Sequence, residues 1–225
     1  MTSAYHPAKI GDLVYSLAAI HRRGGVDTYF IKRPEVAKYL KRLFESQPYI
    51  DTVAQIDKPP AGVTIDFSDY QSFYRLMLRC DLISLNCMVA GVRTHQFPLK
   101  ISSVSLRSKH VKYMNCDIDL DEHRDLQMWR PNQRWLTNIE PVHKSDIIIN
   151  LTERYHDWNS EKHNPVFHFD YTLLKDYDCG FIGLDHEYDL FCDRYGFKPK
   201  RILVEDGLET AQYIAGSKLY VGAVM

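Results

Sequence analysis

The chain has 225 residues, enough for one large domain or two small ones, and carries 28 Lys and Arg against 29 Asp and Glu. This balance gives no electrostatic reason to expect a nucleic-acid-binding surface. Apolar residues make up 45% and charged residues 25%, which argues against intrinsic disorder. No apolar run approaches the roughly 20 residues of a membrane span, and no signal region opens the chain. The five cysteines form no CxxC pair, which predicts reduced thiols and a cytoplasmic location.

In the first part of the chain, short apolar runs alternate with amphipathic ones, which is typical of an α/β fold. Glycine pairs end helices and proline opens them, and these signals set the expected bounds. The expected elements are a helix from near Asp12 to Gly24, a strand over Val26–Ile31, a helix from Pro34, strands over 50–56 and 62–67, and a helix over 70–89.

A second unit is expected to begin near Trp135, and we divide the chain into domains 1–140 and 141–225. The apolar run over 146–151 lacks alternation, which is typical of a parallel strand buried on both faces. The remaining expected elements are strands over 179–184, 201–205 and 218–222, and helices over 187–195 and 208–215. Because the sequence stops directly after the fourth such strand, we expect the second domain to be incomplete.

The first candidate for chemistry is the segment Ile10-Gly11-Asp12 at the start of the first helix. Glycine there lets the backbone approach a ligand closely. Asp12 has two interpretations, which its position alone leaves open. It caps the helix, as an acid in a first turn usually does, or it acts as a general base toward an acceptor hydroxyl.

Three further candidate positions follow buried strands, where α/β folds bind ligands. Thr152 offers a hydroxyl and Arg154 a forked cation for a phosphate, although a plain polar loop fits equally well. Glu187 begins the next helix, where its carboxylate could bridge ribose hydroxyls or simply favour the helix dipole. Asp206 follows the third strand and has the same two interpretations.

Two patterns look like metal sites, and neither is interpreted as one. Alternating acids over 117–121 fit a strand with a solvated acidic face better than a chelating Asp-x-Asp pair. His156, His163 and His168 match no zinc-ligand spacing. No GxSxG, Walker A or GxGxxG motif occurs, so serine hydrolase, ATPase and Rossmann dehydrogenase activities have no support.

Taken in order, four blocks of the sequence resemble the heptosyltransferase-like glycosyltransferases, family 9 and its relatives. The blocks are HPAKIGDLVYSLAAI, IIINLTERYHDW, CGFIGLDHEYDLFCDRYGF and EDGLETAQYIAGSKLYVG, and together they span His6 to Gly222. The resemblance implies a GT-B architecture, in which two Rossmann-like domains with parallel sheets face each other across a cleft. In that family a phosphate loop follows the last block, where this sequence reads Ala223-Val224-Met225.

The resemblance also implies an activity and its residues. A sugar would pass from a nucleotide-sugar donor to an acceptor hydroxyl of a glycan or lipid-linked molecule, in surface-glycan or lipopolysaccharide-type synthesis, without a metal or further cofactor. Asp12 would be the general base, with Gly11 and His6 on the acceptor side. The donor side would comprise Thr152 and Arg154 at the phosphates, Glu187 at the ribose, and Asp206.

Two other functions fit the same fold. One is a non-catalytic nucleotide- or glycan-binding module, either an inactive homologue or a fragment. The other is a sugar-nucleotide epimerase, which needs no acceptor. The sequence does not identify the sugar, the nucleotide or the acceptor. It also does not identify the oligomeric state.

Overall fold

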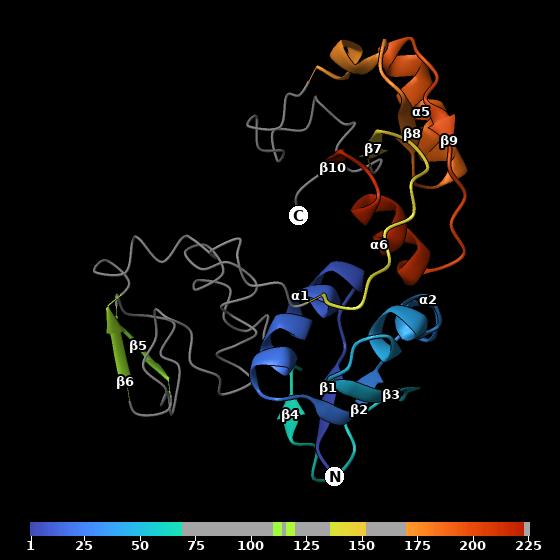
Figure 1. Ribbon diagram of the computed structural model, residues 1–225. Coiled ribbons are helices and arrows are strands. Elements are labelled where there is room, and N and C mark those ends of the chain that lie inside the picture. The colour runs from blue at the N-terminus through green and yellow to red at the C-terminus, as the bar shows by residue number, and fades with distance from the viewer. Residues whose placement is uncertain (69–109, 114–115, 120–135, 152–169, 223–225) are drawn as a thin grey trace. The chain divides into compact units, whose positions relative to one another are not determined.

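The computed structural model describes residues 1–68, 110–113, 116–119, 136–151 and 170–222 (Figure 1). The chain divides into two compact units, residues 1–138 and 139–225. Each unit contains a four-stranded parallel sheet connected through helices, so the predicted α/β class with two Rossmann-like sheets is confirmed. The cleft between the sheets and the incompleteness of the second unit stay predictions, as does the assignment of the units to acceptor and donor.

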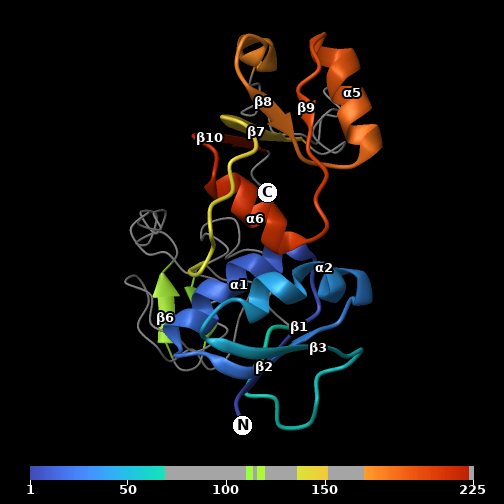
Figure 2. The same cartoon turned by 45° about the vertical axis from the view of Figure 1, so that its right-hand side comes forward.

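Unit 1 is a Rossmann-like sheet whose strands run in the order β3-β2-β1-β4, all of them parallel. Its elements are β1 (Ser3–His6), α1 (Ile10–Arg22), β2 (Val26–Ile31), α2 (Pro34–Glu45), β3 (Ile50–Gln55) and β4 (Ile65–Asp66). The connections β1-α1-β2 and β2-α2-β3 step in one direction along the sheet, and both helices lie on the same face (Figure 2).

The bounds of α1 follow from its sequence. Gly24 and Gly25 take φ values of 92° and 103°, a left-handed conformation that side chains disfavour, and the helix ends just before them. A Cβ at Gly25 would lie 2.6 Å from the carbonyl oxygen of Tyr49, so this position also needs glycine for close backbone packing. The apolar face of α1 packs into the core of unit 1, where Leu13, Leu17 and Ile20 are fully buried, as the helical periodicity predicts.

Unit 2 has the strand order β10-β7-β8-β9, again all parallel. Its elements are β7 (Ile147–Asn150), the 3₁₀ helix η4 (Tyr171–Leu174), β8 (Cys179–Phe181), α5 (Asp185–Tyr195), β9 (Lys200–Arg201), α6 (Gly207–Ala215) and β10 (Leu219–Gly222). Gly196 ends α5 with a φ of 68°, as predicted.

Strand β7 supplies side chains to two hydrophobic cores, one on each face of the sheet. Ile147 and Ile149 pack with Tyr171 and Phe191, on the face that carries η4 and α5. Ile148 packs on the opposite face with Tyr213 of α6. This double burial explains the uninterrupted apolar run in the sequence and confirms the predicted central strand.

Several predicted strands prove shorter than expected, among them the interior strand β8, which covers only Cys179–Phe181 of the expected 179–184. At the sheet edges, β9 covers Lys200–Arg201 and so includes only Arg201 of the expected 201–205, and β4 covers only Ile65–Asp66 of the expected 62–67. Strand β9 has β8 as its one neighbour, and because β8 ends at Phe181, the partner of Arg201, the ladder of β9 ends there too. Residues 110–113 and 116–119 form an antiparallel pair, β5 and β6, which confirms a strand at Cys116–Asp119. The helix expected over 70–89 lies outside the described residues.

The segment that connects the two units, residues 137–142, is hydrogen-bonded at each end to the unit to which that end belongs. The backbone N–H of Thr137 donates to Oε1 of the buried Gln47 at 2.8 Å, and Asn138 Nδ2 donates to the carbonyl of Ser46 at 2.9 Å. On the other side, the N–H of Val142 donates to the carbonyl of Gln212 in α6 at 3.0 Å. Only residues 139–141 therefore lie between the two attachments.

Candidate functional site

The topology itself indicates where each unit would bind a ligand. In a doubly wound sheet the favoured crevice lies outside the carboxyl ends of the strands where the strand order reverses. In unit 1 the reversal falls between β1 and β4, and in unit 2 between β7 and β10. The described candidate residues are located relative to these two reversals of strand order.

His6 is the last residue of β1 and stands at the unit 1 reversal. Its ring is fully buried and stacks on Phe67, just after β4, with ring centroids 5.0 Å apart and an interplanar angle of 23°. The N–H of Ala8 donates to Nδ1 of His6 at 3.3 Å, so this nitrogen carries no proton while the bond is made. His6 thus fixes the turn that leads from β1 into α1.

Gly11 and Asp12 lie in the first turn of α1, immediately beyond that turn. Lys9 is the N-cap residue, which makes Asp12 the third residue of the helix. Asp12 is half-buried and makes no hydrogen bond or ion pair with any residue that the structure describes. Of the two interpretations of Asp12, capping by its side chain therefore finds no support within the described residues.

Asp206 behaves in the opposite way. It is the N-cap residue of α6, is 8% exposed, and its Oδ1 accepts hydrogen bonds from the N–H groups of Leu208 at 2.9 Å and Glu209 at 3.1 Å. These bonds satisfy two of the amides that a helix start leaves without partners. The structure thus supports the capping interpretation of Asp206, and its role toward a donor stays a prediction.

In Glu187, one carboxylate oxygen caps a helix and the other has no partner among the described residues. It is 7% exposed and is the third residue of α5, where Oε2 accepts a hydrogen bond from the N–H of Leu184 at 2.8 Å. This bond is one half of a capping box. Within the described part of the chain it is also the only polar contact of Glu187, so Oε1 has no protein partner there. One carboxylate oxygen is fixed, and the other remains available at the carboxyl end of β8.

Sequence reasoning missed Asn150, which ends β7 at the unit 2 reversal. Its Nδ2 donates to the carbonyl of Ile182 at 2.7 Å, and in the β7–β10 register it stands beside Gly222. A polar residue that ends an apolar strand is the signal that could have found it. Thr152 and Arg154, the predicted phosphate ligands two and four residues further on, lie outside the described residues.

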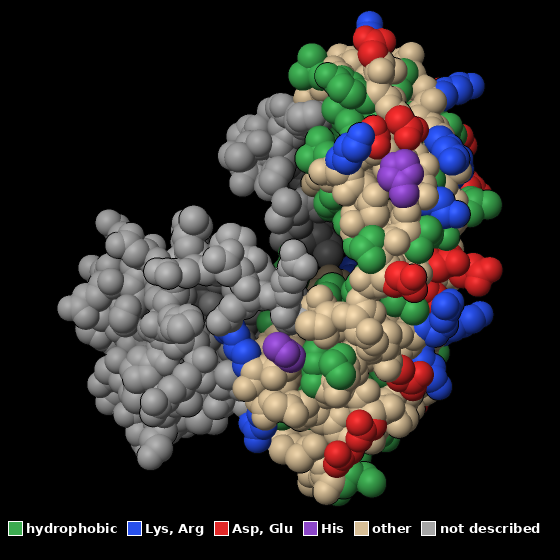
Figure 3. Space-filling model, in the orientation of Figure 1, with side chains coloured by type: hydrophobic (Ala, Val, Ile, Leu, Met, Phe, Trp, Pro, Cys, Tyr) green, Lys and Arg blue, Asp and Glu red, His purple; other side chains and the backbone are tan. Residues whose placement is uncertain are grey.

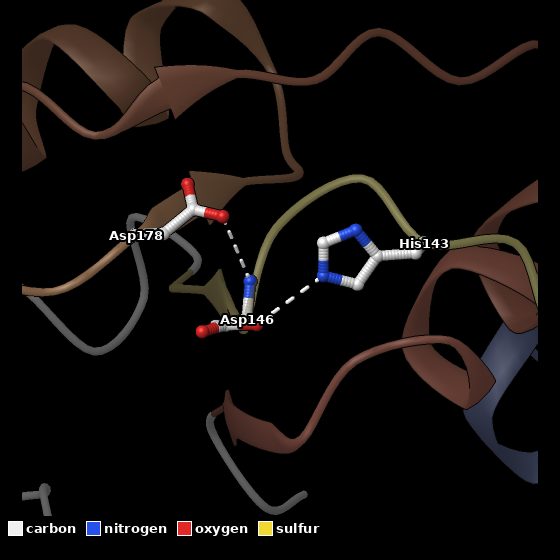
Figure 4. A group of neighbouring side chains, drawn as sticks. All are labelled: His143, Asp146 and Asp178. Atoms are coloured by element: carbon white, nitrogen blue, oxygen red, sulfur yellow. Dashed lines mark hydrogen bonds and ion pairs between the residues drawn. The ribbon is translucent and has the colours of Figure 1, made fainter.

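One group of possible metal ligands lies at the other end of the unit 2 sheet. Ligand atoms of His143, Asp146 and Asp178, located just before β7 and β8, fall within 4.8 Å of one another (Figure 4). Lys218 Nζ contacts Asp146 Oδ2 at 2.8 Å, and His143 Nε2 lies 3.3 Å from Oδ1. The hydrogen bond from Lys218, followed by that from His143, lowers the pKa of the Asp146 carboxyl. Because an ammonium group already pairs with Asp146, we interpret this group as an ion-pair cluster.

The structure describes only some of the residues on which the other expectations about metals, membranes and charge depend. His156, His163, His168 and Asp121 lie outside the described residues. Among those that are described, no helix is both long and apolar enough to cross a membrane. On the face drawn in Figure 3, basic and acidic side chains of the described residues are interspersed, in keeping with the net charge of -1.

Comparison with known proteins gives matches among solved structures alone. No protein-family model and no curated protein matches the chain. The chain is similar to E. coli heptosyltransferase WaaC with ADP, at 14% identity and a TM-score of 0.47, over 98% of this chain and 80% of that chain. The same enzyme with ADP-2-deoxy-2-fluoro heptose matches at 13% identity and a TM-score of 0.45, over 98% and 82% of the two chains.

Proposed function

We propose that the protein is a glycosyltransferase that transfers a sugar from a nucleotide-sugar donor to a hydroxyl of a glycan or lipid-linked acceptor. The observation that carries the proposal is the state of Asp12. Asp12 lies in the first turn of α1, the helix that follows β1, is partly exposed, and its carboxylate has no partner among the described residues. A general base needs a carboxylate that is not already committed to other hydrogen bonds.

Unit 1 would supply the acceptor-side residues. Asp12 takes the proton of the acceptor hydroxyl as that oxygen attacks the sugar. Gly11, directly before it, lets the acceptor approach the start of α1. His6 holds the turn before α1 through its bond to the N–H of Ala8 and its stack on Phe67. The role of His6 is therefore to orient the segment that carries the base.

Unit 2 would bind the donor at the reversal between β7 and β10. Glu187 accepts hydrogen bonds from the ribose through Oε1, because Oε2 is already bonded to Leu184. Thr152 and Arg154 hold the diphosphate, whose negative charge grows as the sugar leaves. No metal or other cofactor is part of the proposal, and the five cysteines of the sequence, which form no CxxC pair, suit a cytoplasmic enzyme.

A transferase assay tests the role of Asp12. Release of nucleoside diphosphate from a panel of nucleotide sugars, with deacylated lipopolysaccharide core as acceptor, is compared for the wild type, Asp12→Asn and Glu35→Gln. Glu35 is the matched control because it is an exposed acid in the first turn of the neighbouring helix α2. We expect Asp12→Asn to lower the rate by about 10²- to 10⁴-fold, the usual contribution of a general base, and Glu35→Gln to leave it unchanged.

Three results would contradict the proposal. Full activity in Asp12→Asn would remove Asp12 as the base. Binding of a nucleotide without turnover of any donor would favour the non-catalytic module, and turnover of a donor without an acceptor would favour the epimerase.

A further inference from the structure

We propose that Arg201 is a positioning residue that orients Glu187 for the donor ribose through a single peptide group. The inference rests on the proposed function, since it concerns the same donor site. Arg201 lies on the edge strand β9, outside every segment that the sequence singled out as functional. Its side chain is 21% exposed and reaches over the loop between β8 and α5.

The guanidinium group of Arg201 binds this loop at several points. It donates to the carbonyl oxygen of Gly183 and, at 3.0 Å, to Oδ1 of Asp185, and a longer bond of 3.4 Å reaches the carbonyl of Phe181. The ring of Tyr188 lies beneath it, with 5.4 Å from the guanidinium carbon to the ring centroid. A planar cation with several donors in a fixed geometry is suited to holding a loop in this way.

The carbonyl of Gly183 and the N–H of Leu184 belong to one planar peptide group. Arg201 donates to that carbonyl, and that N–H donates to Oε2 of Glu187 at 2.8 Å. The three groups form a chain of hydrogen bonds in which the cation polarises the peptide toward the carboxylate, and such chains strengthen each member. The plane of this peptide fixes where Oε2 lies, and Oε2 in turn fixes where Oε1 points.

Gly183 is part of the same arrangement. A Cβ there would lie 2.9 Å from Oε2 of Glu187 and 2.8 Å from the ring of Phe181. The loop therefore brings the carboxylate against the backbone at a position where any side chain would displace it. Without Arg201, the Gly183–Leu184 peptide would lose the hydrogen bond that holds its plane. The Glu187 carboxylate would then lose its fixed orientation.

The test measures recognition of the ribose separately from stability. Dissociation constants for ADP, GDP, CDP and UDP, and for their 2′,3′-dideoxy counterparts, are measured for the full chain and for Glu187→Gln, Arg201→Met and Lys200→Met. Lys200 is the matched control because it precedes Arg201 on β9 and is exposed. A role in stability alone would weaken the binding of both nucleotide forms equally, whereas a positioning role changes their ratio.

We expect the wild type and Lys200→Met to bind one ribonucleotide at least about tenfold more tightly than its dideoxy form, a ratio that corresponds to about 1.4 kcal/mol. In Glu187→Gln and Arg201→Met the ratio should fall below about threefold, while affinity for the dideoxy form stays the same. If Arg201→Met fails to fold, Arg201→Lys decides, because a single ammonium group lacks the second donor arm and should also lower the ratio.

The contradicting results separate the two proposals. A wild-type ratio retained in the Arg201 variant would overturn the positioning role and leave the proposed function standing. A wild-type ratio of one would overturn the ribose role of Glu187 and this inference with it. Absence of binding for all four diphosphates would overturn the proposed donor site itself.

Discussion

Replacing Gly216 by alanine sets two effects of opposite sign against each other. Gly216 ends α6 with φ -85° and ψ -4°, a conformation that alanine adopts freely. On backbone entropy alone the substitution should stabilise the fold by about 0.4–1 kcal/mol. The new Cβ, however, would lie 2.4 Å from the carbonyl carbon and oxygen of Val142 and 2.8 Å from the nitrogen of His143.

The crowding should win, because the contacting atoms belong to the backbone and have no rotamer to change. Ordinary contact between such atoms needs about 3.5 Å, so the connecting segment must move by roughly 1 Å. Overpacking costs about 1–3 kcal/mol, and loss of the bond from Val142 to Gln212 adds about 0.5–1.5 kcal/mol. After subtraction of the entropic gain, we expect a net destabilisation of about 0.5–4 kcal/mol.

Urea unfolding measures the net change, and hydrogen exchange of the Val142 amide shows whether the segment has moved. Ser217→Ala is the control, because it loses one bond, from Ser217 Oγ to the carbonyl of Ile214 at 2.8 Å, and leaves Val142 in place. In Gly216→Ala the Val142 amide should exchange faster, with unit 1 unaffected. An increase in stability with unchanged protection of Val142 would show that the crowding at residue 216 is absent.

Four further predictions concern single side chains. Burial raises the pKa of Tyr171 to about 12, so the stability that its neutral phenol contributes should be full below pH 10 and lost as the pH rises toward 12. Tyr171→Phe should reduce this loss of stability at alkaline pH by at most about 2.7 kcal/mol, measured by unfolding as a function of pH. A pH profile equal to that of the wild type would contradict the expectation. Gln47→Ala should cost about 1–3 kcal/mol in urea unfolding because the N–H of Thr137 loses its buried acceptor, and a neutral effect would show that the bond contributes nothing. Asp206→Ala should cost about 0.5–2 kcal/mol through loss of the α6 cap, whereas Asp206→Asn, which retains an acceptor, should cost less; equal losses would argue against capping. Lys218→Met should raise the pKa of Asp146 toward its ordinary value in an NMR titration, and an unmoved pKa would leave His143 as the cause.

The fold could be predicted from the sequence wherever one physical signal dominates. Ile147, Ile148 and Ile149 are consecutive apolar residues, and a strand that faces a hydrophobic core on each side needs such a pattern. Glycines with positive φ, such as Gly196, ended the helices where expected. Edge strands such as β9 were predicted too long, because sequence periodicity continues where hydrogen-bonding partners end.

The candidate site was predictable only in part, for a different reason. The sequence shows that Asp12, Glu187 and Asp206 each stand at a helix start, but a carboxylate that caps and one that is free have the same local pattern. Their hydrogen bonds separate them: Asp206 holds two amides, Glu187 holds one, and Asp12 holds none among the described residues. Arg201 could not be found from sequence, because the loop that it holds lies 18 positions away at Gly183.

The central claim is that unit 2 binds the nucleotide of a sugar donor at the carboxyl ends of its strands. Hydrogen exchange of the full chain, with and without saturating ADP, GDP, CDP or UDP, tests this directly. We expect at least one diphosphate to slow exchange at Leu151 and Leu184, which follow β7 and β8, and to leave the amides of β2 in unit 1 unchanged. Protection confined to unit 1, or no protection with any of the four, would contradict it.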